Sequence, residues 1–214
     1  NKKKTLIKNL LIKNNKIYLS YVKKVRDKCY VSEVLVSNLN FENIQYSELF
    51  NTNECQPELT NGAGGNLSDF KDNKILMTIG GFRSYSNQKN DNPQNINSLM
   101  GKIISIDEET KKHKILAMGF RNSQGLYYDK KNNVIYSTDH GPKGGDEINI
   151  NTSPDDEEIK NYGWAISSYG EHYGFPDRIN PKLYKLAPLK KSHINHGFIE
   201  PLKYFVPSIA PTQI

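Results

Sequence analysis

A turn rich in glycine and proline offers backbone oxygen atoms to a cation. The turn runs from Gly141 to Gly145 and follows an apolar run that ends at Thr138. Because glycine accepts a positive φ, Gly141, Gly144 and Gly145 can direct successive carbonyl groups toward one point. Calcium and other hard cations bind such oxygens. The residues alone favour a tight turn flanked by solvated acids, and the cation site stays open as the alternative at this stage.

Two further groups of polar residues suggest metal binding but have simpler explanations. His193 and His196 are spaced as H-x-x-H, yet they lack a cysteine or carboxylate at ligand spacing, so we do not expect a zinc site. Four acidic residues at 155–158 follow Ser153-Pro154. Serine, proline and acids in this order are typical of a helix start. The acidic run therefore predicts a short helix.

A recurring pattern indicates which elements position these residues. Its three copies cover residues 15–20, 73–78 and 133–138. Their equivalent isoleucines are Ile17, Ile75 and Ile135, so the copies are spaced by 58 residues (17 to 75) and 60 residues (75 to 135). Each copy begins at an asparagine-rich turn and continues as a β-branched, apolar run, which predicts a buried strand. Repeats that contain several strands are typical of β-propeller blades.

The segments between the copies predict antiparallel hairpins. Residues 29–36 pair with 44–50 in one expected hairpin, and residues 102–107 pair with 113–118 in another. The sequence has no long amphipathic helix between these strands, which excludes a doubly wound α/β fold. We therefore predict an all-β propeller. Residues 1–214 would form a single partial domain of three to four blades, because the ring is incomplete at this length.

Composition narrows the class of protein. The formal net charge is +6, but the lysines are scattered among Asn and Asp, so nucleic-acid binding is not expected. No apolar run approaches the roughly 18 residues of a membrane span. Cys29 and Cys55 permit one disulfide bond without requiring it.

Three motifs give the sequence a specific resemblance. They are G-x-R-N-x-Q-G-L at 119–126, H-G-P-x-G-G-D-E-I-N at 140–149 and N-Y-G-W at 161–164. The sequence resembles the glucose/sorbosone dehydrogenase family from about Leu59 to its end. That family includes soluble glucose and aldose sugar dehydrogenases that use pyrroloquinoline quinone. The resemblance implies a six-bladed β-propeller, a quinone at the top of the central tunnel, calcium, an aldose or related polyol as substrate, and a periplasmic or extracellular location.

The resemblance assigns roles to six residues. Arg121 and Asn122 match the pair that contacts cofactor and substrate, and Gly141 and Pro142 match the positions whose carbonyls hold the cofactor's calcium. Glu147 and the carbonyl of Tyr162 match the ligands of a second, structural calcium site in the family.

The sequence departs from the family at the residue that would remove the sugar's proton. The family pattern H-x-G-G-R falls on residues 62–66, where Gly62 stands for the histidine and Asn66 for the arginine. Gly81 stands for an aspartate after the next strand. Loss of such a base costs roughly 10²–10⁴ in rate. Two hypotheses follow: a quinone-dependent aldose dehydrogenase, or a non-catalytic calcium-binding propeller that binds a sugar or a protein.

Overall fold

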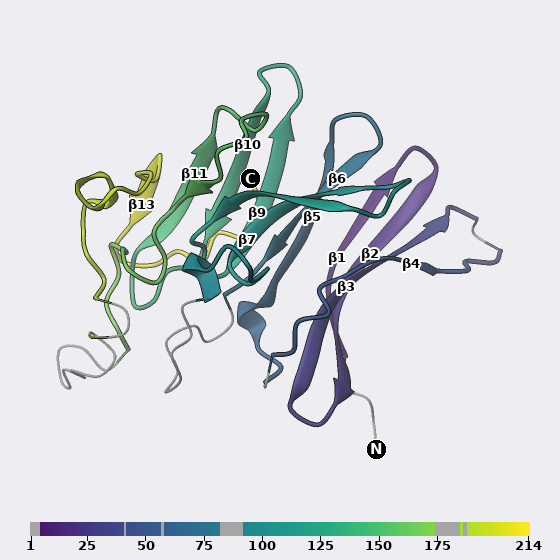
Figure 1. Cartoon of the computed structure of the whole chain (residues 1–214), viewed down its shortest axis with the longest axis horizontal. Coiled ribbons are helices and arrows are strands. Elements are labelled where there is room, and N and C mark those ends of the chain that lie inside the picture. The colour runs from purple at the N-terminus through teal and green to yellow at the C-terminus, as the bar shows by residue number, and fades with distance from the viewer. Residues whose placement is uncertain (1–4, 41, 57, 82–91, 174–184, 186–187) are drawn as a thin grey trace.

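Three antiparallel sheets make up the fold, and Figure 1 shows them arranged like the blades of a fan. The computed structural model describes residues 5–40, 42–56, 58–81, 92–173, 185 and 188–214. Blade 1 has the strand order β1-β2-β3-β4. Its strands are β1 (Thr5–Lys13), β2 (Lys16–Arg26), β3 (Cys29–Asn38) and β4 (Ser47–Asn51).

The other two blades repeat this arrangement. Blade 2 contains β5 (Gly64–Phe70), β6 (Lys74–Ile79), β7 (Lys102–Asp107) and β8 (His113–Met118), and the short β12 (Lys160–Asn161) pairs in parallel with β8. Blade 3 contains β9 (Ser123–Asp129), β10 (Val134–Asp139), β11 (Asp146–Asn151) and β13 (Lys203–Phe205). Three short 3-10 turns cover Asn61–Ala63, Asn92–Gln94 and His193–His196.

The first strand of each blade is its inner strand, since β5 lies against both β1 and β9. The repeat found in the sequence forms the second strand of each blade, because Ile17, Ile75 and Ile135 lie in β2, β6 and β10. The expected hairpins are also present as β3–β4 and β7–β8. These observations confirm the predicted all-β architecture.

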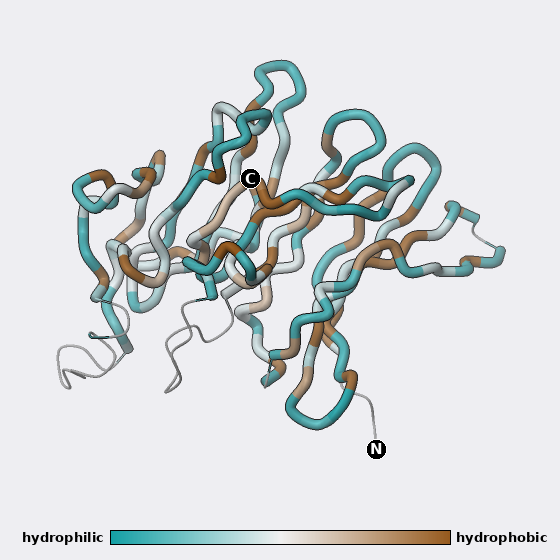
Figure 2. The backbone as a smooth tube through the Cα atoms, viewed as in Figure 1, coloured by the Kyte–Doolittle hydropathy of each residue, from teal (hydrophilic) through white to brown (hydrophobic). Residues whose placement is uncertain are grey.

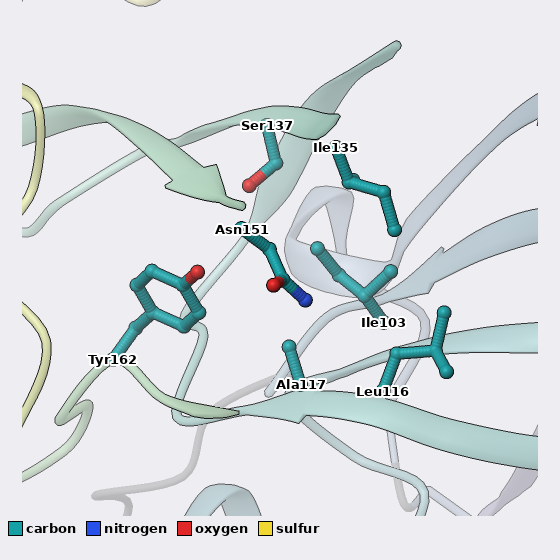
Figure 3. Close-up of a pocket in the computed structure, with 7 residues that line it drawn as sticks. All are labelled: Ile103, Leu116, Ala117, Ile135, Ser137, Asn151 and Tyr162. Carbon is teal, nitrogen blue, oxygen red and sulfur yellow. The ribbon is translucent and has the colours of Figure 1, made fainter. Parts of the chain in front are cut away.

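Apolar side chains fill the space between neighbouring blades, and Figure 2 shows the hydrophobic stretches along the strands, with hydrophilic residues at most of the hairpin turns. Ile75 and Met77 of β6 face blade 1, whereas Leu76 faces blade 3. Figure 3 shows the packing between blades 2 and 3, where Ile103 and Leu116 approach Ile135. The space there has essentially no room for water (about 0 Å³), so it is packed core rather than a substrate pocket.

A hydroxyl at one repeated position ties each blade to the next inner segment. The three hydroxyl residues lie three positions after the isoleucine of each repeat. Each donates a hydrogen bond to a backbone carbonyl of the neighbouring inner segment, and the donor–acceptor pairs are Ser20–Gly65, Thr78–Ser123 (3.0 Å) and Thr138–Pro211 (3.0 Å). The segment around Pro211 therefore occupies, against blade 3, the place that β5 and β9 occupy against blades 1 and 2.

Other expectations have mixed outcomes. Cys29 and Cys55 form a disulfide bond, which settles a pairing that the sequence left open. The prediction of a helix after Ser153-Pro154 is wrong, because residues 153–158 form turns and bends. Their acids pair with lysines: Asp155 with Lys71, and both Asp156 (3.0 Å) and Glu158 (2.9 Å) with Lys160. Among the described residues, no helix is long and apolar enough to cross a membrane.

Candidate functional site

Four chain segments meet at one end of the inner strands and form a rim. They are residues 61–65 before β5, 79–81 after β6, 118–123 between β8 and β9, and 139–146 between β10 and β11. Backbone hydrogen bonds connect them: the Gly80 amide donates to the Ala63 carbonyl (2.9 Å), and the Gly81 amide donates to the Arg121 carbonyl (2.7 Å). The rim therefore brings the Gly62 turn and the Arg121 segment together.

Asp139, at the end of β10, fixes the Arg121–Asn122 pair through its backbone. The carboxylate accepts the Arg121 amide at 2.8 Å and the Asn122 amide at 2.6 Å. Asp139 is buried, and burial raises its pKa to about 6 although these two amide hydrogen bonds lower it. A buried carboxylate with two amide donors holds the turn in one geometry, so both side chains leave the backbone at defined positions.

The Arg121 guanidinium lies over the glycine-rich turn. Its Nη1 donates to the carbonyls of His140 (2.8 Å) and Gly141 (2.7 Å), and its centre lies 5.7 Å from the centre of the Trp164 ring. The Arg121 Nε is buried and has no partner among the described residues. A buried donor without a partner is costly, so this N–H is suited to an acceptor on a ligand.

Asn122 joins this part of the rim to the start of β5. Its Oδ1 accepts the Gln124 side-chain amide at 2.6 Å and the Gly64 backbone amide at 3.3 Å. The Asn122 carbonyl also accepts the His140 amide at 3.1 Å. Gln124 lies in the same sequence motif but was not among the predicted site residues.

Asp146 holds the Gly141 turn against the last residues of the chain. Its carboxylate accepts the Gly141 amide at 3.0 Å and also three donors from 208–210: the Ser208 hydroxyl (3.1 Å) and the amides of Ile209 (2.9 Å) and Ala210 (2.7 Å). Only glycine fits at position 141, because a Cβ there would lie 2.2 Å from the Gly145 carbonyl oxygen. The turn is therefore fixed by one buried acid and by close backbone packing.

The cofactor's calcium fits this turn by the chemistry of its donors. The His140 and Gly141 carbonyls already converge on one positive group, the Arg121 guanidinium. Pro142 is buried in the same turn and packs against Gly170. Neutral backbone carbonyls of this kind are ligands that calcium accepts.

Glu147 lies in a second buried polar group, beneath the turn. Its Oε2 accepts the Asn149 side-chain amide at 3.2 Å, and its Oε1 lies 3.7 Å from His193 Nε2. Burial, and secondly the charge of nearby Asp139, raise the pKa of Glu147 well above its usual value. The Asn149 Oδ1 and both ring nitrogens of His193 are buried and have no hydrogen-bond partner within 3.5 Å among the described residues. A cation beside Glu147 fits this group, since it would offset the clustered acids and satisfy the free oxygen.

Tyr162 is positioned by contacts with blades 2 and 3 rather than by Glu147. Its amide donates to the Met118 carbonyl (2.9 Å), its hydroxyl donates to the Ile150 carbonyl (2.8 Å), and its ring stacks on Phe120 at 4.9 Å. Strand β12 thus carries the N-Y-G-W motif back to the rim. In the described part of the chain no three His, Cys, Asp or Glu side chains are grouped as metal ligands, so both calcium assignments depend on backbone carbonyls.

The family's acid–base positions lie on the same rim but lack suitable side chains. Gly62 lies in the 3-10 turn with φ −76°, and its amide donates to the Thr60 hydroxyl at 3.1 Å. The Asn66 side-chain amide donates to the Gln124 carbonyl at 2.5 Å, so this residue connects β5 to β9. Gly81 lies against the Phe120 and Arg121 carbonyls, with little space for a side chain.

The sequence profile described as Glucose / Sorbosone dehydrogenase matches residues 7–214. The chain belongs to this family. The match begins at residue 7, so the family likeness includes blade 1 as well as the region from Leu59 onward.

Two curated relatives are longer than this chain. It is 28% identical over 170 residues to the aldose sugar dehydrogenase YliI of Escherichia coli, which covers 72% of this chain and 40% of that protein. It is 30% identical over 211 residues to an uncharacterized protein of Borreliella burgdorferi, which covers 94% of this chain and 49% of that protein. The chain thus spans less than half the length of these relatives.

Solved structures agree on the fold. A crystal structure of a glucose dehydrogenase matches 93% of this chain and 58% of its own, with a TM-score of 0.73 and 22% identity. The soluble aldose sugar dehydrogenase of Escherichia coli in its apo-form matches 94% of this chain and 57% of its own, with a TM-score of 0.71 and 24% identity. The three blades therefore have the arrangement of these glucose and aldose dehydrogenase propellers.

Proposed function

We propose that this chain supplies the cofactor-binding rim of an aldose sugar dehydrogenase that oxidises the anomeric carbon of a sugar by hydride transfer to pyrroloquinoline quinone. The observation that carries the proposal is the Arg121–Asn122 pair. Asp139 holds its backbone, and the Arg121 Nε is buried without a partner.

The quinone fits beside Arg121 on electrostatic grounds. Pyrroloquinoline quinone carries carboxylates and adjacent carbonyls, and it accepts a hydride when bound. The planar guanidinium recognises carboxylates through paired N–H donors. The Arg121 Nε–H has no partner among the described residues, and its Nη1 can exchange a backbone carbonyl for a ligand oxygen. The side chain of Asn122 stands beside it and can hydrogen-bond to the quinone or to a sugar hydroxyl.

Calcium would bind at the carbonyls of Gly141 and Pro142. The convergence of the His140 and Gly141 carbonyls on the Arg121 guanidinium supports a cation at this place. We assign a second, structural calcium to Glu147 and the Tyr162 carbonyl, supported by the raised pKa of Glu147 and the free Asn149 Oδ1.

We further propose that the substrate is a small aldose or related polyol and that the protein works in the periplasm or outside the cell. The Cys29–Cys55 disulfide supports this location, because such bonds persist in oxidising compartments. Residues 1–214 belong, in this proposal, to one partial propeller domain.

The experiment is reconstitution of the full-length protein with pyrroloquinoline quinone and calcium, followed by dye reduction with a panel of aldoses. We expect sugar-dependent reduction in the wild type and its loss in Arg121→Met. Glu42→Ala, an exposed change far from the rim, is the control and should retain the wild-type rate. Quinone-loaded protein that reduces no dye with any aldose would overturn the catalytic proposal.

A second candidate function is a propeller that binds a sugar or protein without oxidising it. It is favoured by one observation: neither Gly62, Asn66 nor Gly81 provides an acid–base group. The same reconstitution separates the two functions. Sugar binding measured by calorimetry, with no dye reduction in quinone-loaded protein, would support the second.

A further inference from the structure

Lys8 of blade 1 lies beside the turn that lacks the family's histidine. Strand β1 has a register irregularity between Ile7, which pairs with Tyr21, and Asn9, which pairs with Ser20. Lys8 is the extra residue in this bulge. A bulge redirects a side chain out of the regular alternation of the strand. Here it directs Lys8 toward β5 of blade 2, at the end of the inner strands where the rim lies.

Gly65 provides the space that Lys8 occupies. A Cβ at Gly65 would lie 2.6 Å from Lys8 Cβ and 2.7 Å from Lys8 Cγ, so the aliphatic part of the lysine lies directly on the glycine. The Lys8 Nζ then donates to the Asn61 carbonyl at 3.3 Å. Asn61 immediately precedes Gly62, so the amine lies at the turn where the family has its base.

The surroundings of Lys8 make its ammonium group easier to deprotonate than that of a fully solvated lysine. No salt bridge to Lys8 is present among the described residues, and burial lowers its pKa from the usual value. The adjacent β5 residues Gly64, Gly65 and Asn66 do not titrate. On β2, the nearest titratable side chain is Tyr21, whose pKa is raised by burial and by its hydrogen bond to Glu33, so it stays neutral.

We propose that Lys8 is the general base that takes the place of the missing histidine. This inference rests on the proposed dehydrogenase function. In its unprotonated form, the Nζ would accept the proton of the sugar's anomeric hydroxyl and become an ammonium group. With a quinone bound as the hydride acceptor, the C1–H electron pair would leave as hydride, the C1–O bond would become a carbonyl and the sugar a lactone. The ammonium group then returns its proton to water.

The first test compares Lys8→Met and Lys8→Arg in the full-length, quinone-loaded protein. We expect both to lower kcat by about 10²–10⁴-fold, because methionine cannot accept a proton and arginine stays protonated. Quinone affinity should change by less than about twofold, since Lys8 does not touch Arg121 or the Gly141 turn. The matched control is Lys112→Met, an exposed lysine in the β7–β8 turn, which should retain wild-type kcat.

Three further readouts separate a base from a structural lysine. Small primary amines should restore turnover to Lys8→Ala in proportion to their basicity, and Gly62→His should partly restore Lys8→Met, because φ −76° at Gly62 suits any residue. Independently of activity, competitive acetylation read by peptide mass spectrometry should give Lys8 a lower pKa than Lys112.

The outcomes are distinguishable. An active wild type with an equally active Lys8→Arg, or activity lost in Lys8→Ala with no rescue by any amine, would overturn the role of Lys8 and leave the proposed function standing. A quinone-loaded wild type that oxidises no aldose would overturn both. A normal pKa for Lys8 in the acetylation experiment would overturn the role of Lys8 whatever the activity.

Discussion

The two halves of the rim are held in different ways. The anchored half, residues 119–122 and 139–146, is fixed by two buried carboxylates that accept backbone amides: Asp139 for Arg121 and Asn122, and Asp146 for the Gly141 turn. In the glycine half, residues 61–65 and 79–81, the amides donate to uncharged acceptors: backbone carbonyls, as from Gly80 to Ala63, and neutral side-chain oxygens, as from Gly65 to Thr78. The anchored half therefore presents preset side chains, whereas the glycine half presents a backbone surface.

This difference explains how the two halves can serve one reaction. Contacts to a cofactor require fixed geometry, and buried acids that hold amide donors provide it. A proton acceptor requires a titratable group at the right place, and that group can come from another strand. In this protein the glycine half leaves room for Lys8 from blade 1 to reach the turn at Asn61.

The largest effect should follow from Asp146→Ala in the anchored half. The change leaves four donors without their acceptor: the amide of Gly141, and the Ser208 hydroxyl and the amides of Ile209 and Ala210 in the exposed segment 208–210. We expect a loss of about 3–5 kcal/mol in the free energy of unfolding, measured by urea denaturation. The exposed change Glu42→Ala should leave the midpoint unchanged, and an equally small effect for Asp146→Ala would show that the anchored half is not held by this acid.

Arg121→Met should mainly affect the cofactor. Removing hydrogen bonds to a charged ligand costs about 1.5–3 kcal/mol, so quinone binding should weaken by roughly 10–100-fold in a fluorescence titration. Asn66→Ala in the glycine half is the matched comparison, and we expect its quinone affinity to stay within about threefold, because Asn66 contacts the Gln124 carbonyl rather than the cofactor turn. Equal losses in both variants would remove the distinction between the halves.

Thr78→Val tests the connection between the halves. The Thr78 hydroxyl accepts the amides of Gly65 (3.1 Å) and Asn66 (2.9 Å) and donates to the Ser123 carbonyl (3.0 Å). Valine has the same shape but leaves these groups unsatisfied, so we expect a loss of about 2 kcal/mol in thermal or urea unfolding. Thr78→Ser should retain most of the stability. If both substitutions behave alike, the hydroxyl does not connect the blades.

The smallest effect is a pH dependence that arises from Asp139. Its pKa in the folded state is raised from 3.8 to about 6, so between these values the folded protein binds more protons than the unfolded chain. The stability of the wild type relative to Asp139→Asn should therefore fall as pH rises from about 4 to about 6. Urea titrations at several pH values measure the difference, and a difference that rises over this range would contradict the burial argument.

The repeated strands could be predicted from sequence because the pattern is local. An asparagine turn followed by a β-branched run occurs at Ile17, Ile75 and Ile135, and each run became the second strand of a blade. The positions of the motifs around Arg121 and Gly141 followed in the same way, since both lie where strands end.

Long-range features could not be predicted in this way. The side chain of Lys8 reaches the rim through a bulge and the space over Gly65, which involves two strands 57 residues apart in sequence (8 to 65). His193 seemed a weak zinc candidate, yet it lies buried beside Glu147 because the chain after β12 returns to blade 3. The acidic run at 155–158 does not form the predicted helix. Its acids pair instead with Lys71, which is distant in sequence, and with Lys160, which lies just downstream.

We propose above that the anchored half of the rim is a quinone site that depends on calcium. The most direct measurement is an equilibrium titration of the full-length protein with pyrroloquinoline quinone, with calcium and with chelator, followed by protein fluorescence. We expect saturable 1:1 binding of the quinone that requires calcium. The quinone affinity should fall by roughly 10–100-fold in Arg121→Met and should persist in Lys8→Met. Absence of binding, or binding that is indifferent to both calcium and Arg121, would contradict it.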